Sequence, residues 1–204
     1  MTVARAGRPL QEAEEAVVML HGRGATAESI LTLAEELGRP DLAYLAPQAP
    51  RFTWYPYSFL APLDQNEPHL SAALQTVDDL LAEIAAAGIP PERTVLLGFS
   101  QGACLSLEYA ARHAQILGGV VALSGGLIGP PGTPRDCAGS FAGTPVFLGC
   151  SDRDPHIPEP RVHESAEVFR RMGARVTERI YPGLGHTVNE DELAWVRDLL
   201  GALG

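Results

Sequence analysis

Short runs of apolar residues alternate along this chain with longer segments in which apolar residues recur every three or four positions. The short runs have the length of strands buried on both faces, and the spaced patterns are typical of helices with one apolar side. Apolar runs occur at residues 17–20, 42–45, 95–97, 120–123 and 146–148, and residues 176–180 alternate between apolar and polar. Helical patterns occur at 30–37, 70–84, 101–113, 162–169 and 189–200. This alternation predicts an α/β fold, with a mostly parallel central sheet and helices on both faces.

The chain has 204 residues, which fit one domain spanning residues 1–204. Little room is left for a large cap domain, so we expect an open site. Two proline-rich segments, residues 47–68 and 127–145, are longer than simple connections, and long loops in a compact domain are often functional. Asn189 and Glu192 form a capping-box pattern at the start of the last helix.

The charge balance narrows the range of partners. All 15 basic residues are arginine and the formal net charge is −10, so the surface should repel phosphate backbones and anionic lipids. Nucleic acid is therefore an unfavourable partner. No segment approaches the roughly 18 apolar residues of a membrane span, and residues 1–16 contain no apolar run of signal-peptide length. We expect a soluble cytoplasmic protein without stable membrane insertion.

The cysteines give no sign of a disulfide framework or of a metal centre. The chain has three, at irregular spacing, and an odd number argues against both a set of disulfides and a zinc site. They are Cys104, Cys137 and Cys150. We expect neither a metal nor an organic cofactor.

The segment Gly98-Phe99-Ser100-Gln101-Gly102 matches the pattern G-x-S-x-G. This pattern places the serine on a sharp strand-to-helix turn, where neighbouring backbone passes so close that the flanking positions must be small. A buried strand pattern ends just before the motif and a helical pattern begins just after it, which is the required context. We predict that Ser100 is a catalytic nucleophile; the alternative is a glycine-rich turn with an incidental serine.

A serine hydroxyl is a weak nucleophile, so it needs a base within hydrogen-bond reach and a partner that orients the base. In this architecture the acid and then the histidine follow the serine along the chain. The histidines are His21, His69, His113, His156, His163 and His186. His186 lies on a late loop with Gly183 and Gly185, between the last strand pattern and the last helix pattern, and is the predicted base. The alternative is a histidine that only satisfies a loop carbonyl.

Two aspartates follow the strand pattern at residues 146–148, where the acid is expected. Asp154 precedes Pro155, which favours an extended backbone. Asp152 is closer to the strand and is well placed to hold the loop through turn hydrogen bonds. Spacing alone leaves the two candidates equal.

Taken together, these motifs resemble the phospholipase/carboxylesterase family of α/β-hydrolases, which includes the acyl-protein thioesterases. Three blocks carry the resemblance: Leu-His-Gly-Arg-Gly at residues 20–24, Gly-Phe-Ser-Gln-Gly at 98–102, and Asp-Arg-Asp-Pro-His-Ile-Pro at 152–158 with His186 downstream. The blocks follow the family's order and span nearly the whole chain.

The resemblance implies that Asp154 is the catalytic acid and that Asp152 stabilises its loop. One position departs from the family pattern. The residue after Asp-Pro is often apolar in the family, whereas here it is His156. A histidine at that position is expected to contact Asp154 or to line the site.

Ester hydrolysis builds negative charge on the carbonyl oxygen, and two backbone N–H groups aimed at that oxygen lower the barrier. One donor should be Gln101, directly after the nucleophile and at the start of a helix. The second should come from the loop at residues 21–24. The resemblance implies that it is Arg23, through its backbone alone, with His21 buttressing the loop. The alternative for this block is a plain glycine turn.

Aromatic residues concentrate in the segment 52–60, inside the first long loop. They would line an acyl pocket or form a lid, or they would only pack the loop against itself. The candidate substrate-lining residues are Trp54, Tyr55, Phe59, Leu60 and His156. An apolar acyl chain or an aromatic ester fits such a lining better than a charged substrate.

These features predict a serine hydrolase, a carboxylesterase that cleaves small-molecule esters with small to medium acyl groups or aromatic groups. An acyl-protein thioesterase or a lysophospholipase is the alternative, because the same machinery cleaves both bond types. A peptidase is disfavoured because no second domain recognises a peptide, and a dienelactone-type cysteine hydrolase is opposed by Ser100. Outside enzymes, the alternative is a binding protein of this fold with an inactive site. Relatives are often dimers, so the resemblance also suggests a homodimer.

Overall fold

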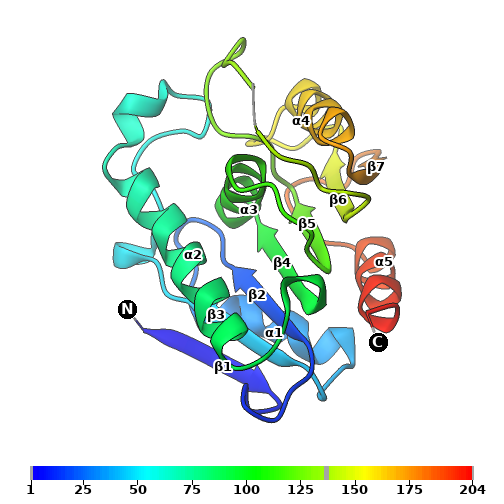
Figure 1. The fold of residues 1–204 in the computed structure, drawn as a ribbon. Helices are drawn as coiled ribbons and strands as arrows, with labels where there is room; N and C mark the ends of the chain where they lie inside the picture. Colours follow the sequence, from blue (N-terminus) through cyan, green and yellow to red (C-terminus); the bar gives the residue numbers. More distant parts are fainter. Residues whose placement is uncertain (1, 136–137, 204) are drawn as a thin grey trace.

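The computed structural model describes residues 2–135 and 138–203, and a seven-stranded sheet forms its centre (Figure 1). The strands lie in the order β1-β3-β2-β4-β5-β6-β7. β1 pairs with β3 in antiparallel fashion, and the other neighbouring strands are parallel. The strands are β1 Val3–Gly7, β2 Ala16–Leu20, β3 Ala43–Pro47, β4 Thr94–Phe99, β5 Gly119–Leu123, β6 Pro145–Ser151 and β7 Arg175–Tyr181. The predicted α/β fold with a mostly parallel sheet is confirmed.

Helices cover both faces of this sheet (Figure 1). The α-helices are α1 Ala27–Leu37, α2 His69–Ala86, α3 Gln101–Arg112, α4 Glu159–Arg171 and α5 Glu190–Gly201, and short 3-10 turns are η1 Pro50–Phe52, η2 Leu63–Asn66 and η3 Pro91–Arg93. Side chains of α2, α3 and α4 pack into one core cluster, and those of α1 and α5 pack into another on the opposite face. The predicted capping box of Asn189 and Glu192 starts α5.

Strand β2 shows why the sequence reads as unbroken apolar runs. Val18 and Leu20 join the cluster under α2, α3 and α4, whereas Val17 and Met19 join the cluster under α1 and α5. Successive side chains of a strand point to opposite faces, so a strand covered on both sides must be apolar throughout.

The edge strand β1 is the element that the apolar pattern does not predict. It pairs with β3 along one side only, and its residues alternate between partial burial and exposure. Its Arg5 forms an ion pair of 2.7 Å with Glu83 of α2. A strand at the rim of a sheet needs no continuous apolar run, and this one has none.

The strand order reverses at β2. The chain moves from β2 to β3 on one side and then crosses to β4 on the other. In open α/β sheets, ligands bind in the crevice beyond the carboxyl ends of the strands at this reversal. The loop after β2 and the turn between β4 and α3 meet there, so the fold brings residues 21–26 against residues 98–102. No helix in the described ranges is both long enough and apolar enough to cross a membrane.

Candidate active site

Ser100 occupies a strained turn between β4 and α3. Its backbone angles are φ 54° and ψ −118°, a combination that residues other than glycine rarely adopt. Its N–H donates to the carbonyl of Leu123 at 2.9 Å, which ties the turn to the end of β5. A Cβ at Gly98 would collide with the backbone of Gly102, and one at Gly102 would collide with the carbonyl oxygen of Leu20. These contacts are the steric reason for the two glycines of the motif.

His186 lies between Ser100 and Asp154. Its Nε2 is 2.9 Å from the Ser100 Oγ, and its Nδ1 is 2.6 Å from the Asp154 Oδ2. The structure therefore brings the three predicted side chains together, although they come from three separate loops. The histidine requires only one proton, on Nδ1, to donate to the carboxylate while Nε2 accepts from the serine hydroxyl.

Asp154 is held as an ionised acceptor. Burial raises its pKa, but hydrogen bonds from His186 and from the backbone N–H groups of His156 and Ile157 outweigh this and leave the pKa below its usual value. Burial raises the pKa of the neighbouring Cys150 thiol to about 12, so it remains protonated, with its Sγ 3.8 Å from Asp154 Oδ2. A carboxylate in this state can stabilise a positively charged imidazole.

Asp152 has a different set of contacts. Its Oδ1 accepts from the N–H of Gly183 at 2.7 Å. Beside it, the Ser151 Oγ accepts from the N–H of Gly185 at 3.0 Å. These two bonds fasten the loop after β6 to the loop that carries His186. The geometry thus separates the two aspartates that spacing leaves equal: one contacts the imidazole and the other holds the loop.

His21 supports the loop after β2 from below. It is buried; its Nδ1 lies 2.7 Å from the Gly22 carbonyl oxygen, and its Nε2 accepts from the Ala49 N–H at 3.1 Å. Burial lowers its pKa, so a neutral ring with the proton on Nδ1 satisfies both contacts. The indole N–H of Trp54 also donates to the His21 carbonyl at 2.8 Å.

Arg23 and Gln101 line the same cavity as Ser100, and the backbone N–H of neither has an acceptor among the described residues. Their side chains form hydrogen bonds with the aromatic segment, which the sequence did not predict. The Arg23 guanidinium donates to the carbonyl oxygens of Tyr55, Pro56 and Tyr57 at 3.0, 2.9 and 2.7 Å.

The side chain of Gln101 fastens the same segment. Its Oε1 accepts from the Trp54 N–H at 2.9 Å and from the Thr53 hydroxyl at 3.2 Å, and its Nε2 donates to the Tyr55 carbonyl at 2.8 Å. Both candidate oxyanion donors therefore hold the aromatic loop, residues 52–60, through their side chains.

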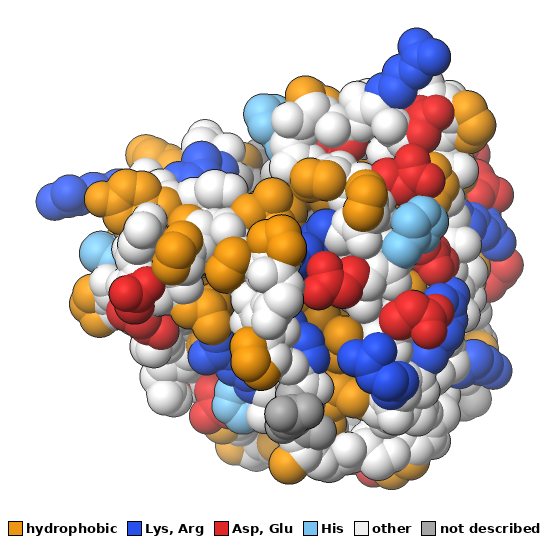
Figure 2. All heavy atoms as spheres, turned by 90° about the horizontal axis from the view of Figure 1, so that it is seen from above, with side chains coloured by type: hydrophobic (Ala, Val, Ile, Leu, Met, Phe, Trp, Pro, Cys, Tyr) orange, Lys and Arg blue, Asp and Glu red, His pale blue; other side chains and the backbone are white. Residues whose placement is uncertain are grey.

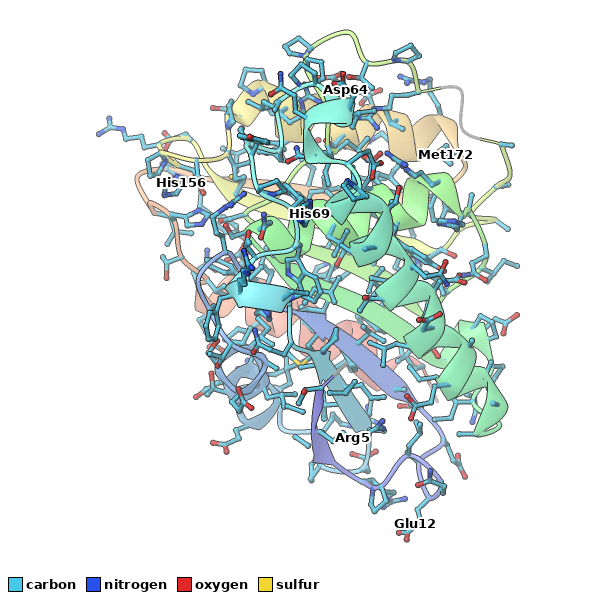
Figure 3. The ribbon with its side chains drawn as sticks, turned by 90° about the vertical axis from the view of Figure 1, so that its left-hand side faces the viewer. Arg5, Glu12, Asp64, His69, His156 and Met172 are labelled. Atoms are coloured by element: carbon cyan, nitrogen blue, oxygen red, sulfur yellow. The ribbon has the colours of Figure 1, made fainter. Side chains whose placement is uncertain are left out.

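A cavity of about 490 Å³ opens beside Ser100 between the aromatic loop and the loop after β6. Tyr55, Phe59 and His156 line it, as predicted. The His156 ring lies edge-on to His186, with centroids 4.8 Å apart. Figure 3 shows His156 on the loop after β6, at the same end of the molecule as Asp64 and opposite to Arg5 and Glu12.

Two of the predicted lining residues lie elsewhere. Trp54 is 3% exposed and packs beneath the loop against His21, because its indole N–H finds its acceptor there. Leu60 is partly buried against the main core cluster. Tyr57, Phe99 and Ile157 line the cavity in addition; each lies inside a segment that the sequence singles out, but none was predicted to line the site.

Three histidines lie outside this site, whereas Cys104 lines the cavity and Cys150 lies beside Asp154. His69 begins α2, His113 follows α3 and stacks on Tyr109, and His163 on α4 pairs with Glu159 and Glu178. Cys104 and Cys150 are buried free thiols, and Cys137 lies outside the described residues. Within the described ranges, no group of three or more His, Cys, Asp or Glu side chains is placed to hold a metal ion. None of the described residues of the second long loop, 127–135 and 138–145, lines this cavity.

Figure 2 shows the molecule from above. Hydrophobic side chains gather on the left and in the centre of this view, whereas acidic and basic side chains gather on the right, the side on which α4 lies in Figure 1. Among the described residues that line the cavity, Arg23 is the only arginine, and its guanidinium donates to backbone carbonyl oxygens. The site therefore presents apolar surface and neutral polar groups to a ligand.

Known proteins are similar to this chain in sequence and in fold. The family model described as Phospholipase/Carboxylesterase matches residues 2–203. The crystal structure of a phospholipase/carboxylesterase from Dyadobacter fermentans is 46% identical, covers 97% of this chain and 95% of its own, and superposes with a TM-score of 0.93. Esterase PE8 is 25% identical, with 98% of each chain covered and a TM-score of 0.82. Acyl-protein thioesterase 1 of Gibberella zeae is 28% identical over 210 residues, which cover 90% of this chain and 88% of that protein. The chain belongs to the phospholipase/carboxylesterase family, as its three sequence blocks predict.

Proposed function

We propose that this protein is a serine hydrolase that cleaves carboxylic esters, with Ser100 as nucleophile, His186 as general base and Asp154 as the acid that orients it. One observation carries the proposal. The imidazole of His186 lies within hydrogen-bond distance of both the Ser100 hydroxyl and the Asp154 carboxylate. This is the arrangement that turns a serine into a nucleophile.

The reaction proceeds in two steps. The Ser100 Oγ attacks the ester carbonyl carbon while its proton passes to the His186 Nε2, and the oxyanion faces the backbone N–H groups of Arg23 and Gln101. The intermediate collapses, His186 protonates the leaving oxygen, and the acyl group remains on Ser100. Water then attacks the acyl-enzyme as His186 takes its proton; the carboxylic acid leaves and the serine recovers its hydrogen.

The cavity supports an uncharged acyl group of small to medium size, or an aromatic one. Its volume is about 490 Å³, and Tyr55, Phe59 and Ile157 supply apolar surface. An anionic acyl group would find Arg23 already bound to three carbonyls.

A thioesterase activity is the second candidate, and the similarity to Acyl-protein thioesterase 1 of Gibberella zeae favours it. The same triad and oxyanion hole would cleave a thioester, with a thiol as the leaving group. The two candidates differ in the bond that gives the higher kcat/KM.

A fluorophosphonate probe tests the nucleophile, since it forms a covalent bond only with an activated serine. We expect wild-type protein to be labelled at Ser100 and folded Ser100→Ala to be unlabelled. Equal labelling of both proteins, or no labelling of folded wild type, would refute the proposal and favour a binding protein with an inactive site. A series of p-nitrophenyl esters of increasing acyl length, with a thioester of matched acyl group, then decides chain length and bond type.

A further inference from the structure

A second hollow lies on the other side of His186, along the exposed face of α1. It has a volume of about 520 Å³. Side chains of Ile30 and Leu33 on α1 and of Thr187 and Val188 after the catalytic loop line it. We call it the α1 groove. The reaction described above uses only the cavity beside Ser100, so it gives the α1 groove no role.

The α1 groove meets the cavity beside Ser100 at a shared wall. Gly22, Ala25, Phe99 and His186 line both. The rings of Phe99 and His186 pack against each other with centroids 5.0 Å apart. A molecule bound with its reacting carbon at the shared wall therefore extends in two directions.

The two hollows differ in which catalytic groups they contain. Ser100 and Gln101 line the first cavity and are not among the residues of the α1 groove, whereas His186 lines both. During the reaction the acyl group becomes bonded to Ser100, so it must occupy the cavity that contains Ser100. The leaving group is instead protonated by His186 and departs. We therefore place it in the α1 groove, which His186 lines and Ser100 does not.

We propose that the α1 groove is the leaving-group subsite and that it takes an uncharged, apolar alcohol or phenol; this rests on the ester hydrolase function proposed above. Leu33 and Val188 offer partly exposed apolar surface beside the buried Ile30, and Ser29, Thr32 and Thr187 offer hydroxyl groups. None of the described residues that line the groove is Arg, Asp or Glu. Glu28 is exposed on the first turn of α1, next to Ser29.

This lining disfavours an anionic leaving group. A phosphodiester head group would meet no cation in the groove and would lie near Glu28, and the whole chain carries a formal charge of −10. Among esters, the groove therefore selects simple alkyl or aryl alcohols over the glycerophosphoryl group of a lysophospholipid.

The test keeps the acyl group fixed and varies the alcohol. Methyl, butyl and hexyl acetate probe the apolar surface, and phenyl acetate with 4-sulfophenyl acetate probes charge. We expect kcat/KM of the wild type to rise about tenfold from methyl to hexyl acetate and to be lower for the sulfonated ester, because each buried methylene adds binding in the groove.

Thr32→Glu places a carboxylate at an exposed position in the groove without touching the triad. It should remove most of the gain from methyl to hexyl acetate, while the preference among methyl esters of longer acids changes less than about twofold. Ser71→Glu, which adds the same charge at an exposed position on α2, should leave both series unchanged.

Three outcomes would overturn the assignment while leaving the hydrolase function intact. They are a flat alcohol series in an active wild type, a Thr32→Glu variant that alters the acyl series instead, and one that alters neither series. Loss of fluorophosphonate labelling at Ser100 is a separate result, because it refutes the hydrolase function itself.

Discussion

The two sides of Ser100 are built from different kinds of hydrogen bond. On the oxyanion side, residues 21–26 and the aromatic loop are joined by the Arg23 guanidinium, the Gln101 amide and the Trp54 indole, which donate to backbone carbonyls. None of these three groups changes its charge near neutral pH. His21 also supports this side, and burial lowers its pKa, so this side keeps its geometry near neutral pH.

The acid–base side, residues 151–158 and 182–192, is organised by carboxylates that accept from backbone N–H groups. Asp152 accepts from Gly183, Asp154 accepts from His156 and Ile157, and Glu192 accepts from Asn189. A carboxylate loses its charge when it is protonated, so the support of this side depends on pH. The oxyanion side is a fixed frame, and the acid–base side is the part that solution conditions adjust.

The largest effect is expected from Asp154→Asn on the acid–base side. The amide keeps the shape of the side chain but no longer offers His186 a charged acceptor, so the imidazolium loses its stabilisation. We expect kcat for p-nitrophenyl acetate to fall on the order of 10³- to 10⁴-fold.

Asp152→Asn is the matched control, because it changes the same atoms two positions away on a residue that contacts Gly183 instead of His186. It should cost less than about tenfold in kcat, through a looser loop. If the ranking of the two variants is reversed, the orienting acid is Asp152.

A smaller effect is expected from Arg23→Ala on the oxyanion side. The backbone N–H remains, but the aromatic loop loses three hydrogen bonds from the guanidinium. We expect kcat/KM to fall about 10- to 100-fold, with the larger loss for longer acyl chains that contact the loop. Steady-state kinetics over the p-nitrophenyl series measures it.

Arg23→Lys should recover part of this loss, since an ammonium reaches one carbonyl but lacks the fork that reaches three. Arg51→Ala removes an exposed arginine close to the aromatic loop and should change kcat/KM less than about twofold. Indistinguishable kinetics of Arg23→Ala and Arg51→Ala would mean that the guanidinium does not support the site. The pH profile of kcat should keep its shape in Arg23→Ala, because the lost donor does not titrate.

The smallest effect concerns stability and belongs to Glu192, behind the loop of His186. Burial raises its pKa to about 7, against the lowering by the Asn189 N–H, and its Oε1 has no partner among the described residues. Between the ordinary value of 4.5 and about 7, the folded protein binds more protons at this site than the unfolded chain. The free energy of unfolding should therefore fall as pH rises through that window.

Glu192→Gln removes this titration. We expect the free energy of unfolding of the variant, relative to that of wild type, to increase by about 2 kcal/mol from pH 5 to pH 8. Urea denaturation at each pH measures it. Glu190→Gln, an exposed neighbour in the same turn, should show no such gain. Parallel pH curves for wild type and Glu192→Gln would show that Glu192 does not carry the dependence.

The elements that the sequence predicts correctly are those whose burial is complete. β2, β4 and β5 are apolar at nearly every position because helices cover both faces, and such runs are visible in the sequence. β1 was missed because an edge strand needs little apolar surface, and Val3–Gly7 carries Arg5 and Gly7. An apolar pattern in the sequence reflects burial, so a strand with little buried surface shows little apolar pattern.

The site shows the same division. The turn at Ser100 was predictable because its two glycines stand at fixed positions on either side of the serine, even though the backbone that Gly102 avoids belongs to Leu20, far away in the sequence. The contacts of Arg23 with the aromatic loop join residues 32 to 34 positions apart. Nothing in the local sequence indicates which carbonyls a guanidinium will reach. Nor does it indicate that Trp54 points away from the cavity and packs beneath the loop.

The sequence by itself determined the alternation of strands and helices from β2 onward, the family, and the turn that presents Ser100, because burial and a fixed motif leave a pattern along the chain. Only the tertiary structure showed the contact of Asp154 with His186 that the resemblance implies, the contact of His186 with Ser100 from 86 positions away, and two hollows that share His186 as a lining residue. The parallel sheet brings the ends of distant strands to one edge. Which side chains touch there depends on how each loop folds back over that edge, and loop conformation is set by long-range hydrogen bonds rather than by periodic pattern.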